Sequence, residues 1–402
     1  MQDTLGNSVT TASPEALRLI DSAIDHHSRA WPGALELAQA ATREDPALAI
    51  GHALQGLIHA VWGRRQAAKE AMSRAVSAVS SASTRERSVV ELLDHVWRGR
   101  THAALAWLLL HLRRHPTDLL ALTTGVGAYG LLAFSGRADH DEQRLAVLDE
   151  VEPQYPPDFP WLLAYRGWAR IELGAADEGL DMARRAIAAR PENAHSAHIV
   201  AHGFHELGRF EEYLRFLSTW LSGYPDDALM WGHLQWHAAL AELALDRDGD
   251  AMKRCMGPVV SYLGRGAPFM GLADAASLLW RLQLRGVPGL PWQVADEHAR
   301  EHFPRGSNAF GELHLAMHAA AARDLPRLLE CRGRAEKLLA DGSLGAGATV
   351  AWCQALQAGM DGRDGQPQFE ACEAQAVRLG GSNAQRSVIT ATWRPDGLRE
   401  QQ

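Results

Sequence analysis

The chain has 402 residues, of which 40 are basic and 48 are acidic, giving a formal net charge of −8. Both signs are mixed along the chain without a basic stripe, so we expect no nucleic-acid partner. Helix formers such as Ala, Leu, Arg and Glu dominate, and runs of β-branched residues are scarce. The sequence therefore predicts an all-α protein, long enough for a large core or an array of repeats.

The cysteines, the N-terminus and the apolar runs all favour a cytoplasmic protein. No Cys-x-x-Cys spacing joins the four cysteines, which suits a reducing compartment; they are Cys255, Cys331, Cys353 and Cys372. The first residues are polar and lack the basic and apolar regions of a signal peptide. The longest apolar runs, such as 103–112, are far short of the roughly 20 residues that a bilayer needs. We therefore expect no association with membranes.

The first half of the chain is predicted to form short helices that follow a disordered tail over residues 1–13. Ser13 as N-cap and Pro14 at the first helical position start the first helix. A loop-rich segment, 136–160, contains four prolines that exclude a long helix, although a short one is predicted around 142–150. Short breaks separate the earlier helices, as expected for antiparallel hairpins; these helices are predicted near 33–44, 47–62, 65–80 and 84–99.

From Trp161 onward the pattern is typical of tetratricopeptide repeats, which have two helices in about 34 residues. The first such repeat has its turn at Gly174 and ends at Pro191, and the next has its turn at Gly208. Later helices are predicted near 274–285, 292–302, 308–322, 325–339, 346–358 and 367–379. We therefore predict one continuous α-solenoid domain over residues 14–395, an α-α superhelix with a concave face.

Two histidine pairs are the most unusual feature of the sequence. The segment 193–245 contains six histidines, namely His195, His198, His202, His205, His233 and His237. His198 and His202 are one helical turn apart, as are His233 and His237, so each pair lies on one helix face. The two pairs are offset by 35 residues, about one repeat period. They therefore occupy equivalent positions on neighbouring helices, and we expect them to face one shared space.

Three interpretations of this cluster stay open. The histidines are a buried polar network, in which every imidazole needs its own partner. Alternatively, His198, His202, His233 and His237 bind a divalent transition metal such as Zn or Fe, with a carboxylate from Glu206 or Glu312 as an additional ligand. In the third interpretation the cluster, with His205, is a metal-free pocket for general acid and base catalysis.

Several residues outside the two pairs are candidates for the same site. Asp274 either orients a pocket histidine, as part of the catalytic set, or forms a structural ion pair with Arg281. Ser382 and Asn383 are helix caps in one interpretation, whereas the exposed amides of that helix start would suit an anionic ligand in the other. The predicted substrate-binding residues are Trp168, Trp236, His314, Asn383, Gln385 and Arg386, and His318 is one turn from His314.

Taken together, several short sequence motifs resemble the tetratricopeptide repeat protein 38 family, and the resemblance is to a bacterial member of it. The similarity spans roughly residues 15 to 390, and its most specific piece is GGSNAQR at 380–386. The other strings are Gly51-His52-Ala53, His115-Pro116-Thr117-Asp118, the run ending at Pro191, the two histidine pairs, and Asp274 to Gln283. The resemblance implies an all-helical repeat fold of cytosolic type, without a settled activity.

Two positions depart from the pattern of that family. His205 stands where the family usually has Glu, and Val126-Gly127 stand where it tends to have His-Asp. If the family residues at these positions take part in chemistry, that chemistry differs here. His205 is therefore where we expect the specificity of this chain to differ.

The leading functional hypothesis is a protein that binds a small molecule and is an enzyme, using the histidine-lined concave pocket for metal-assisted or acid/base chemistry. The alternative is a non-enzymatic tetratricopeptide adaptor for a peptide or protein partner, since many such arrays have that function. The two differ in whether the groove is closed around a ligand or open. The substrate, the reaction and the oligomeric state stay open, a homodimer included.

Overall fold

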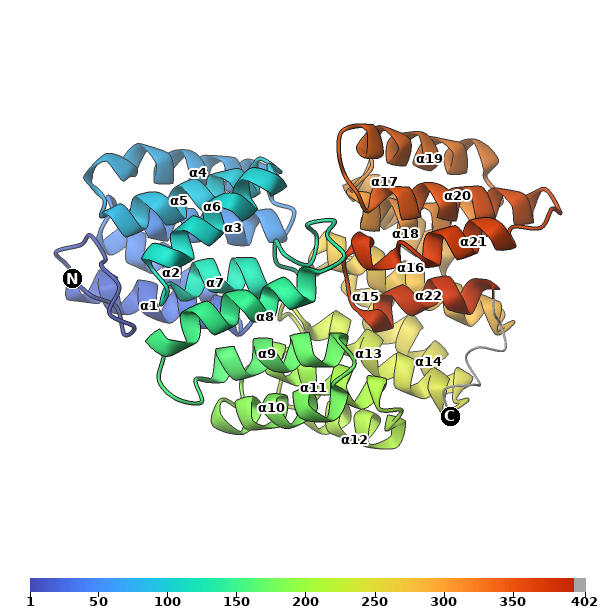
Figure 1. The fold of residues 1–402 in the computed structure, drawn as a ribbon, viewed down its shortest axis with the longest axis horizontal. Helices are drawn as coiled ribbons and strands as arrows, with labels where there is room; N and C mark the ends of the chain where they lie inside the picture. Colours follow the sequence, from blue (N-terminus) through green and yellow to red (C-terminus); the bar gives the residue numbers. More distant parts are fainter. Residues whose placement is uncertain (394–402) are drawn as a thin grey trace. The chain divides into compact units, whose positions relative to one another are not determined.

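The computed structural model describes residues 1–393, and their regular structure is helical (Figure 1). Among these residues the β pairing is limited to an isolated bridge between Gln2 and Ser8. The predicted all-α, tetratricopeptide-like class is confirmed. The predicted end of the domain, residue 395, lies outside the described residues. None of the helices within 1–393 combines the length and apolar character that a membrane crossing requires.

Contacts between residues divide the chain into two compact units. The first contains 1–135, 141–169 and 181–197, and the second contains 136–140, 170–180 and the chain from residue 198 onward. The single continuous domain over residues 14–395 stays a prediction beside this division into two units. The repeat pattern runs through the boundaries without a flexible linker, so the sequence carries no sign of them.

The helices up to the histidine-rich segment are short and mostly packed as neighbouring pairs, with α1 against α2 and α3 against α4. Their bounds are α1 Pro14–Ser28, α2 Ala34–Glu44, α3 Ala49–Val61, α4 Arg65–Ala78, α5 Thr84–Trp97, α6 Thr101–Arg114, α7 Leu119–Val126 and α8 His140–Val151. Of the unit boundaries, 140/141 falls within α8 and 135/136 just before it. The others fall within the next three helices, α9 Pro160–Glu172, α10 Ala176–Ala189 and α11 Ala194–Glu206. Single 3₁₀ turns follow α4 and α8, at Val79–Ser81 and Glu152–Gln154.

The second unit continues the pairing to the end of the described chain. Its helices are α12 Phe210–Leu221, α13 Trp231–Ala244, α14 Asp248–Arg254, α15 Val260–Tyr262, α16 Pro268–Leu284, α17 Trp292–His302, α18 Ala309–Ala321, α19 Leu325–Ala340, α20 Ala346–Met360, α21 Gln366–Glu373 and α22 Asn383–Trp393. A π-helical segment, Cys255–Val259, joins α14 to α15, and a 3₁₀ turn, Ala376–Leu379, precedes α22. Pro258 lies inside the π segment, where it interrupts regular α-helical bonding.

Local sequence signals explain how the helices start and stop. The Ser13 side chain accepts a hydrogen bond from the amide of Ala16, with Pro14 at the first helical position of α1, as predicted. Gly174 and Gly208 end α9 and α11 with φ of 87° and 65°, a left-handed conformation that glycine adopts without strain. The two predicted repeat turns are confirmed at these glycines.

The first 13 residues are not the disordered tail that the sequence predicts, but a segment fastened to the first unit. Val9 is buried, and the amide and hydroxyl of Thr10 both donate to the Glu86 carboxylate at the start of α5. The Asn7 side chain donates to the Thr117 carbonyl at 3.1 Å. These contacts are made by polar side chains rather than by an apolar repeat, which is why hydrophobic periodicity does not predict them.

Helix α13 is the central element of the second unit. Residues 232–243 are all buried, so the helix has no solvent-facing side. It packs against α12, α14 and α16. In a helix that is buried on all sides, each polar side chain needs a hydrogen-bond or metal partner from a neighbouring element. His233 and His237 must therefore each have such a partner.

Candidate metal centre

The two histidine pairs meet in the second unit as one cluster of four imidazoles. The Nε2 atom of His198 lies 2.9 Å from Nε2 of His202 and 2.9 Å from Nε2 of His233. The ring of His237 lies with its centroid 4.5 to 4.9 Å from those of the other three. Adjacent turns of α11 thus supply one pair and adjacent turns of α13 the other, facing a single point.

This cluster is closed to solvent. The four residues are 0 or 1 % exposed. The Trp236 ring stacks on His233 with centroids 5.3 Å apart, and its indole N–H donates to the Ser277 hydroxyl at 3.0 Å. The histidines are therefore enclosed by packed helices rather than spread along an exposed groove.

The opposite ring nitrogen, Nδ1, has an oxygen partner on two of the histidines. His233 Nδ1 lies 2.9 Å from Oδ1 of Asp274 on α16. His237 Nδ1 lies 2.5 Å from the Tyr213 hydroxyl on α12. Burial raises the pKa of Tyr213 well above its ordinary value, so the phenol keeps its proton. Partners of this kind fix the orientation of an imidazole and direct its other nitrogen toward a ligand.

A third oxygen partner comes from the end of α9. Oε1 of Glu172 lies 3.7 Å from Nδ1 of His202, with both side chains 1 % exposed. The second oxygen of Glu172 accepts from the backbone N–H of Asn383 at 2.8 Å and lies 3.5 Å from Nη2 of Arg386. The Arg386 side chain also donates to the Gly381 carbonyl and to the Asn383 side chain, each at 2.6 Å. The GGSNAQR segment thus positions a carboxylate beside the cluster.

Two imidazoles of the cluster, those of His202 and His237, are in the neutral form that binds metals. Burial, reinforced by His205 and His233, lowers the pKa of His202 well below its ordinary value. Burial and the neighbouring histidines, first among them His202, do the same to the pKa of His237. Near neutral pH these two rings therefore carry no charge.

The donor set fits a transition metal. If Asp274 accepts the Nδ1 proton of His233, Nε2 of that ring presents its lone pair to His198. One N–H group on Nε2 of His198 cannot donate to both His202 and His233. A single divalent cation, in contrast, can accept the nitrogen lone pairs of several imidazoles at once. Nitrogens of a tetrahedral zinc site stand about 3.3 Å apart, for Zn–N distances of about 2.0–2.1 Å. For such a site the two 2.9 Å contacts would widen by a few tenths of an ångström, and the nitrogens of the His198, His202 and His237 group, which lie up to 4.8 Å apart, would move closer.

The buried Nε2 of His237 has no hydrogen-bond partner within the described chain, so this nitrogen is available as a metal ligand. One ring nitrogen each of His198, His202 and His237 lies within 4.8 Å of the others, a grouping that can hold a metal ion. His233 joins them through its 2.9 Å contact with His198.

His205 and His314, two other candidates, have different surroundings. The His205 ring packs edge-on against Phe210 and Tyr213, and burial lowers its pKa to about 4. His314 bonds through Nδ1 to the carbonyl of Phe310, one turn earlier on α18. His314 is buried and His205 is half-buried, and neither belongs to the four converging rings.

Of the remaining candidates, Arg281 bonds to backbone carbonyls, whereas Gln385 and Ser382 cap a helix. Arg281 forms no ion pair with Asp274 within residues 1–393; its guanidinium donates to the carbonyls of Ser277 and Ala384. Gln385 and Ser382 exchange side-chain-to-backbone bonds of 3.0 and 3.1 Å that cap α22.

Trp168 and the two carboxylates proposed as extra ligands are also accounted for. Trp168 belongs to the first unit, where the Arg144 guanidinium lies 5.9 Å from its ring centroid. Glu312 is 0 % exposed and accepts from the Ser307 amide and from Arg334. Glu206 is exposed. None of the three has a contact with the cluster in the described residues.

Comparisons with known proteins add a distant structural likeness. No family model matches the sequence. A chain of the solved structure of Naa15/Naa10 bound to HypK-THB is similar over 96% of this chain and 62% of its own, with 13% identity and a TM-score of 0.23. The present chain thus spans less than two thirds of that neighbour. A likeness of this size carries no inference about activity or partners.

Proposed function

We propose that this helical-repeat protein binds one divalent transition-metal ion, of the zinc or iron class, through His198, His202, His233 and His237. The observation that carries the proposal is the convergence of ring nitrogens at 2.9 Å, with Asp274 and Tyr213 on the far side of two rings. Imidazole nitrogens suit these metals, and oxygen partners on the second nitrogen are typical of metal-binding histidines.

Closure of the cluster favours a metal that holds the fold together. A structural metal site has all its positions filled by protein, whereas a catalytic site keeps one open to water or substrate. Side chains that are 0 or 1 % exposed leave no such opening. The ion would tie α11 to α13, and through Asp274 to α16, so that binding energy stabilises the second unit.

Metal content of the purified protein tests the proposal. Elemental analysis after dialysis against zinc or iron(II) should give about one ion per chain for the wild type. His198→Gln should lose that ion, because Nε2 of His198 faces two of the other rings. His102→Gln, at an exposed position of α6, is the matched control and should keep it. A wild type without metal, or a His198→Gln variant with undiminished metal, would refute the metal centre.

A catalytic use of the same cluster is the second candidate. The Asp274–His233 contact resembles the pairing of a base with the group that orients it, and this favours metal-assisted or acid/base chemistry. It requires an opening of the helices to admit a small molecule. If the backbone amides of α13 exchange their hydrogens more slowly than the protein turns over a substrate, the helices do not open fast enough and this route is excluded.

Three broader predictions remain proposals beside the metal centre. They are membership of the tetratricopeptide repeat protein 38 family, a cytoplasmic location, and the alternative of an adaptor for a peptide or protein, including a second copy of the chain. The adaptor alternative rests on the repeat fold alone. A pull-down that recovers one partner in a fixed ratio, unaffected by His198→Gln, would favour the adaptor.

A further inference from the structure

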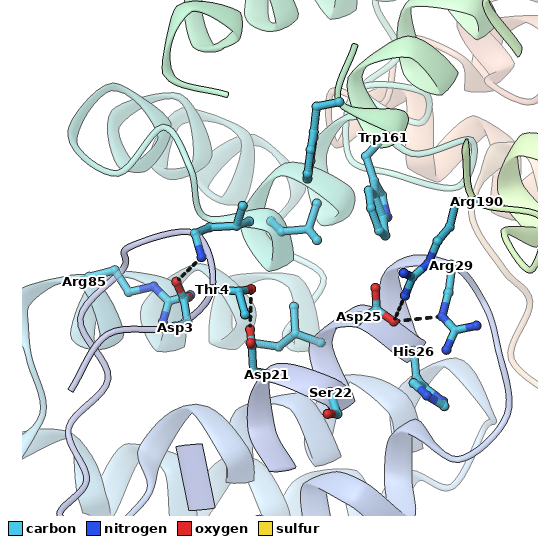
Figure 2. A pocket seen from close by; sticks show the side chains of 14 residues that line it. Asp3, Thr4, Asp21, Ser22, Asp25, His26, Arg29, Arg85, Trp161 and Arg190 are labelled. Carbon is cyan, nitrogen blue, oxygen red and sulfur yellow. Dashed lines mark hydrogen bonds and ion pairs between the residues drawn. The ribbon is translucent and has the colours of Figure 1, made fainter. Parts of the chain in front are cut away.

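The first unit contains a pocket that is separate from the histidine centre (Figure 2). Its volume is about 480 Å³, within the range of small-molecule sites. The N-terminal segment, α1 and α5 form one side, and the start of α7, the start of α9 and the end of α10 complete it. All of the lining belongs to a single unit.

One part of the lining is apolar and aromatic. Phe159 stacks on Trp161 with centroids 5.1 Å apart and an interplanar angle of 27°. Leu5, Ile24 and Leu119 extend this surface. The apolar part of a ligand can pack against this surface, and the aromatic rings supply much of the contact area.

Two of the three lining carboxylates are already compensated. Asp25 accepts from Arg29 Nε at 2.9 Å and from Arg190 Nη2 at 2.7 Å, as the dashed lines in Figure 2 show. Asp3 lies 4.0 Å from the guanidinium of Arg85 and accepts from the backbone amides of the N-terminal segment. These two carboxylates hold the pocket wall together.

Asp21 is different from the other two. It accepts one hydrogen bond, from the Thr4 hydroxyl at 3.2 Å, and forms no ion pair within residues 1–393. Burial raises its pKa, and the nearby charges of Asp3 and Asp25 raise it further. A carboxylate in this position is a negative charge that a bound cation would compensate.

We propose that this pocket binds an organic ammonium ion with an apolar body, of the arylalkylamine type. The ammonium group lies against Asp21, and the body lies against Leu119, Phe159 and Trp161. An N⁺–H···O⁻ bond to a partly desolvated carboxylate is stronger than a neutral one. The lining guanidinium groups are already engaged, those of Arg29 and Arg190 by Asp25 and that of Arg85 by Asp118. The inference is independent of the metal centre.

Calorimetric titration of the full chain with 2-phenylethylammonium tests this site. Two probes of similar size are the comparators: 3-phenylpropionate, which reverses the charge, and 2-phenylethanol, which removes it. We expect the ammonium to bind at least about tenfold more tightly than either, since a charge-assisted bond is worth more than a neutral one. Asp21→Asn should weaken ammonium binding by a similar factor, because it keeps the Thr4 contact but removes the charge.

Asp181→Asn is the matched control, because it makes the same charge change at an exposed position of α10 in the same unit. It should leave ammonium binding unchanged. The proposal is overturned if the carboxylate probe binds as tightly as the ammonium, if Asp21→Asn binds like the wild type, or if no saturable binding is seen at millimolar ammonium. Should Asp21→Asn fail to fold, the three probes on the wild type decide alone.

Discussion

Asp274 Oδ1 lies 2.9 Å from His233 Nδ1, so a carboxylate on α16 holds an imidazole of α13 from the side opposite His198. The contact links two helices through one buried bond, with the Asp274 side chain 5 % and the His233 side chain 1 % exposed. When the Asp274 carboxylate accepts the Nδ1 proton of His233, Nε2 of that ring is left to face the cluster.

Asp274→Asn should weaken metal binding by about 10- to 100-fold, the usual effect of losing the outer partner of a histidine ligand. The amide oxygen of Asn still accepts a hydrogen bond, so the fold should persist and only the charge is lost. Competition with a chelator of known affinity measures the change. Asp250→Asn, on the exposed side of α14, is the control. Equal affinities for wild type and Asp274→Asn would show that the carboxylate plays no part.

Tyr213→Phe should destabilise the second unit by about 1–3 kcal/mol, because it removes the hydroxyl beside a buried imidazole nitrogen. Urea unfolding followed by circular dichroism gives the difference. A double-mutant cycle with His237→Leu separates the hydrogen bond from packing, since the hydroxyl has nothing to bond once the imidazole is gone. A coupling energy indistinguishable from zero would contradict the assigned contact.

The sequence is sufficient to predict the four-ring cluster and insufficient to predict what surrounds it. The i, i+4 spacing and the repeat period place His198 and His233 on equivalent faces, because both follow from helix geometry alone. Glu172 and Tyr213 were missed. Glu172 ends a preceding helix and Tyr213 reads as a core residue of an amphipathic one, so only tertiary packing brings them to the rings.

The role of the GGSNAQR segment was likewise beyond sequence patterns. Its polar residues are compatible with helix caps or with an anion site, and in the structure Arg386 and the amide of Asn383 contact a carboxylate of the protein itself, Glu172. The folded N-terminal segment is a similar case, because Thr10 is fastened by polar bonds to Glu86 that leave no periodic signal. Side-chain partners far apart in sequence are what periodicity cannot supply.

Arg386→Gln should destabilise the protein by about 3–5 kcal/mol, since it leaves the Glu172 carboxylate buried without its cation. Glu172→Gln in the same chain should restore part of that loss, because a neutral amide needs no compensation. Chemical unfolding of the two single variants and the double variant measures the coupling. Arg300→Gln, an exposed residue of α17, is the control and should change stability little. Additive effects of the two substitutions would contradict a direct pair.

Acidification should destabilise the metal-free protein, beginning below about pH 6.5, the ordinary pKa of an unfolded histidine. Burial lowers the pKa values of His202 and His237 in the folded chain, so the unfolded chain binds more protons there as pH falls. The contribution of these two rings is thus fully present above that pH and is lost as pH falls toward their folded pKa values. Unfolding free energies measured between about pH 7.5 and pH 5 give the slope.

Other buried histidines add to that slope, His314 with a pKa lowered to about 4 among them, so variants are needed to isolate the cluster. His237→Gln should make the slope shallower by up to one proton, whereas exposed His102→Gln should leave it unchanged. With zinc bound, protons compete with the ion for the same nitrogens, so metal release should accompany the loss of stability. A slope that is identical in wild type and His237→Gln would show that this ring titrates alike in the folded and unfolded chains.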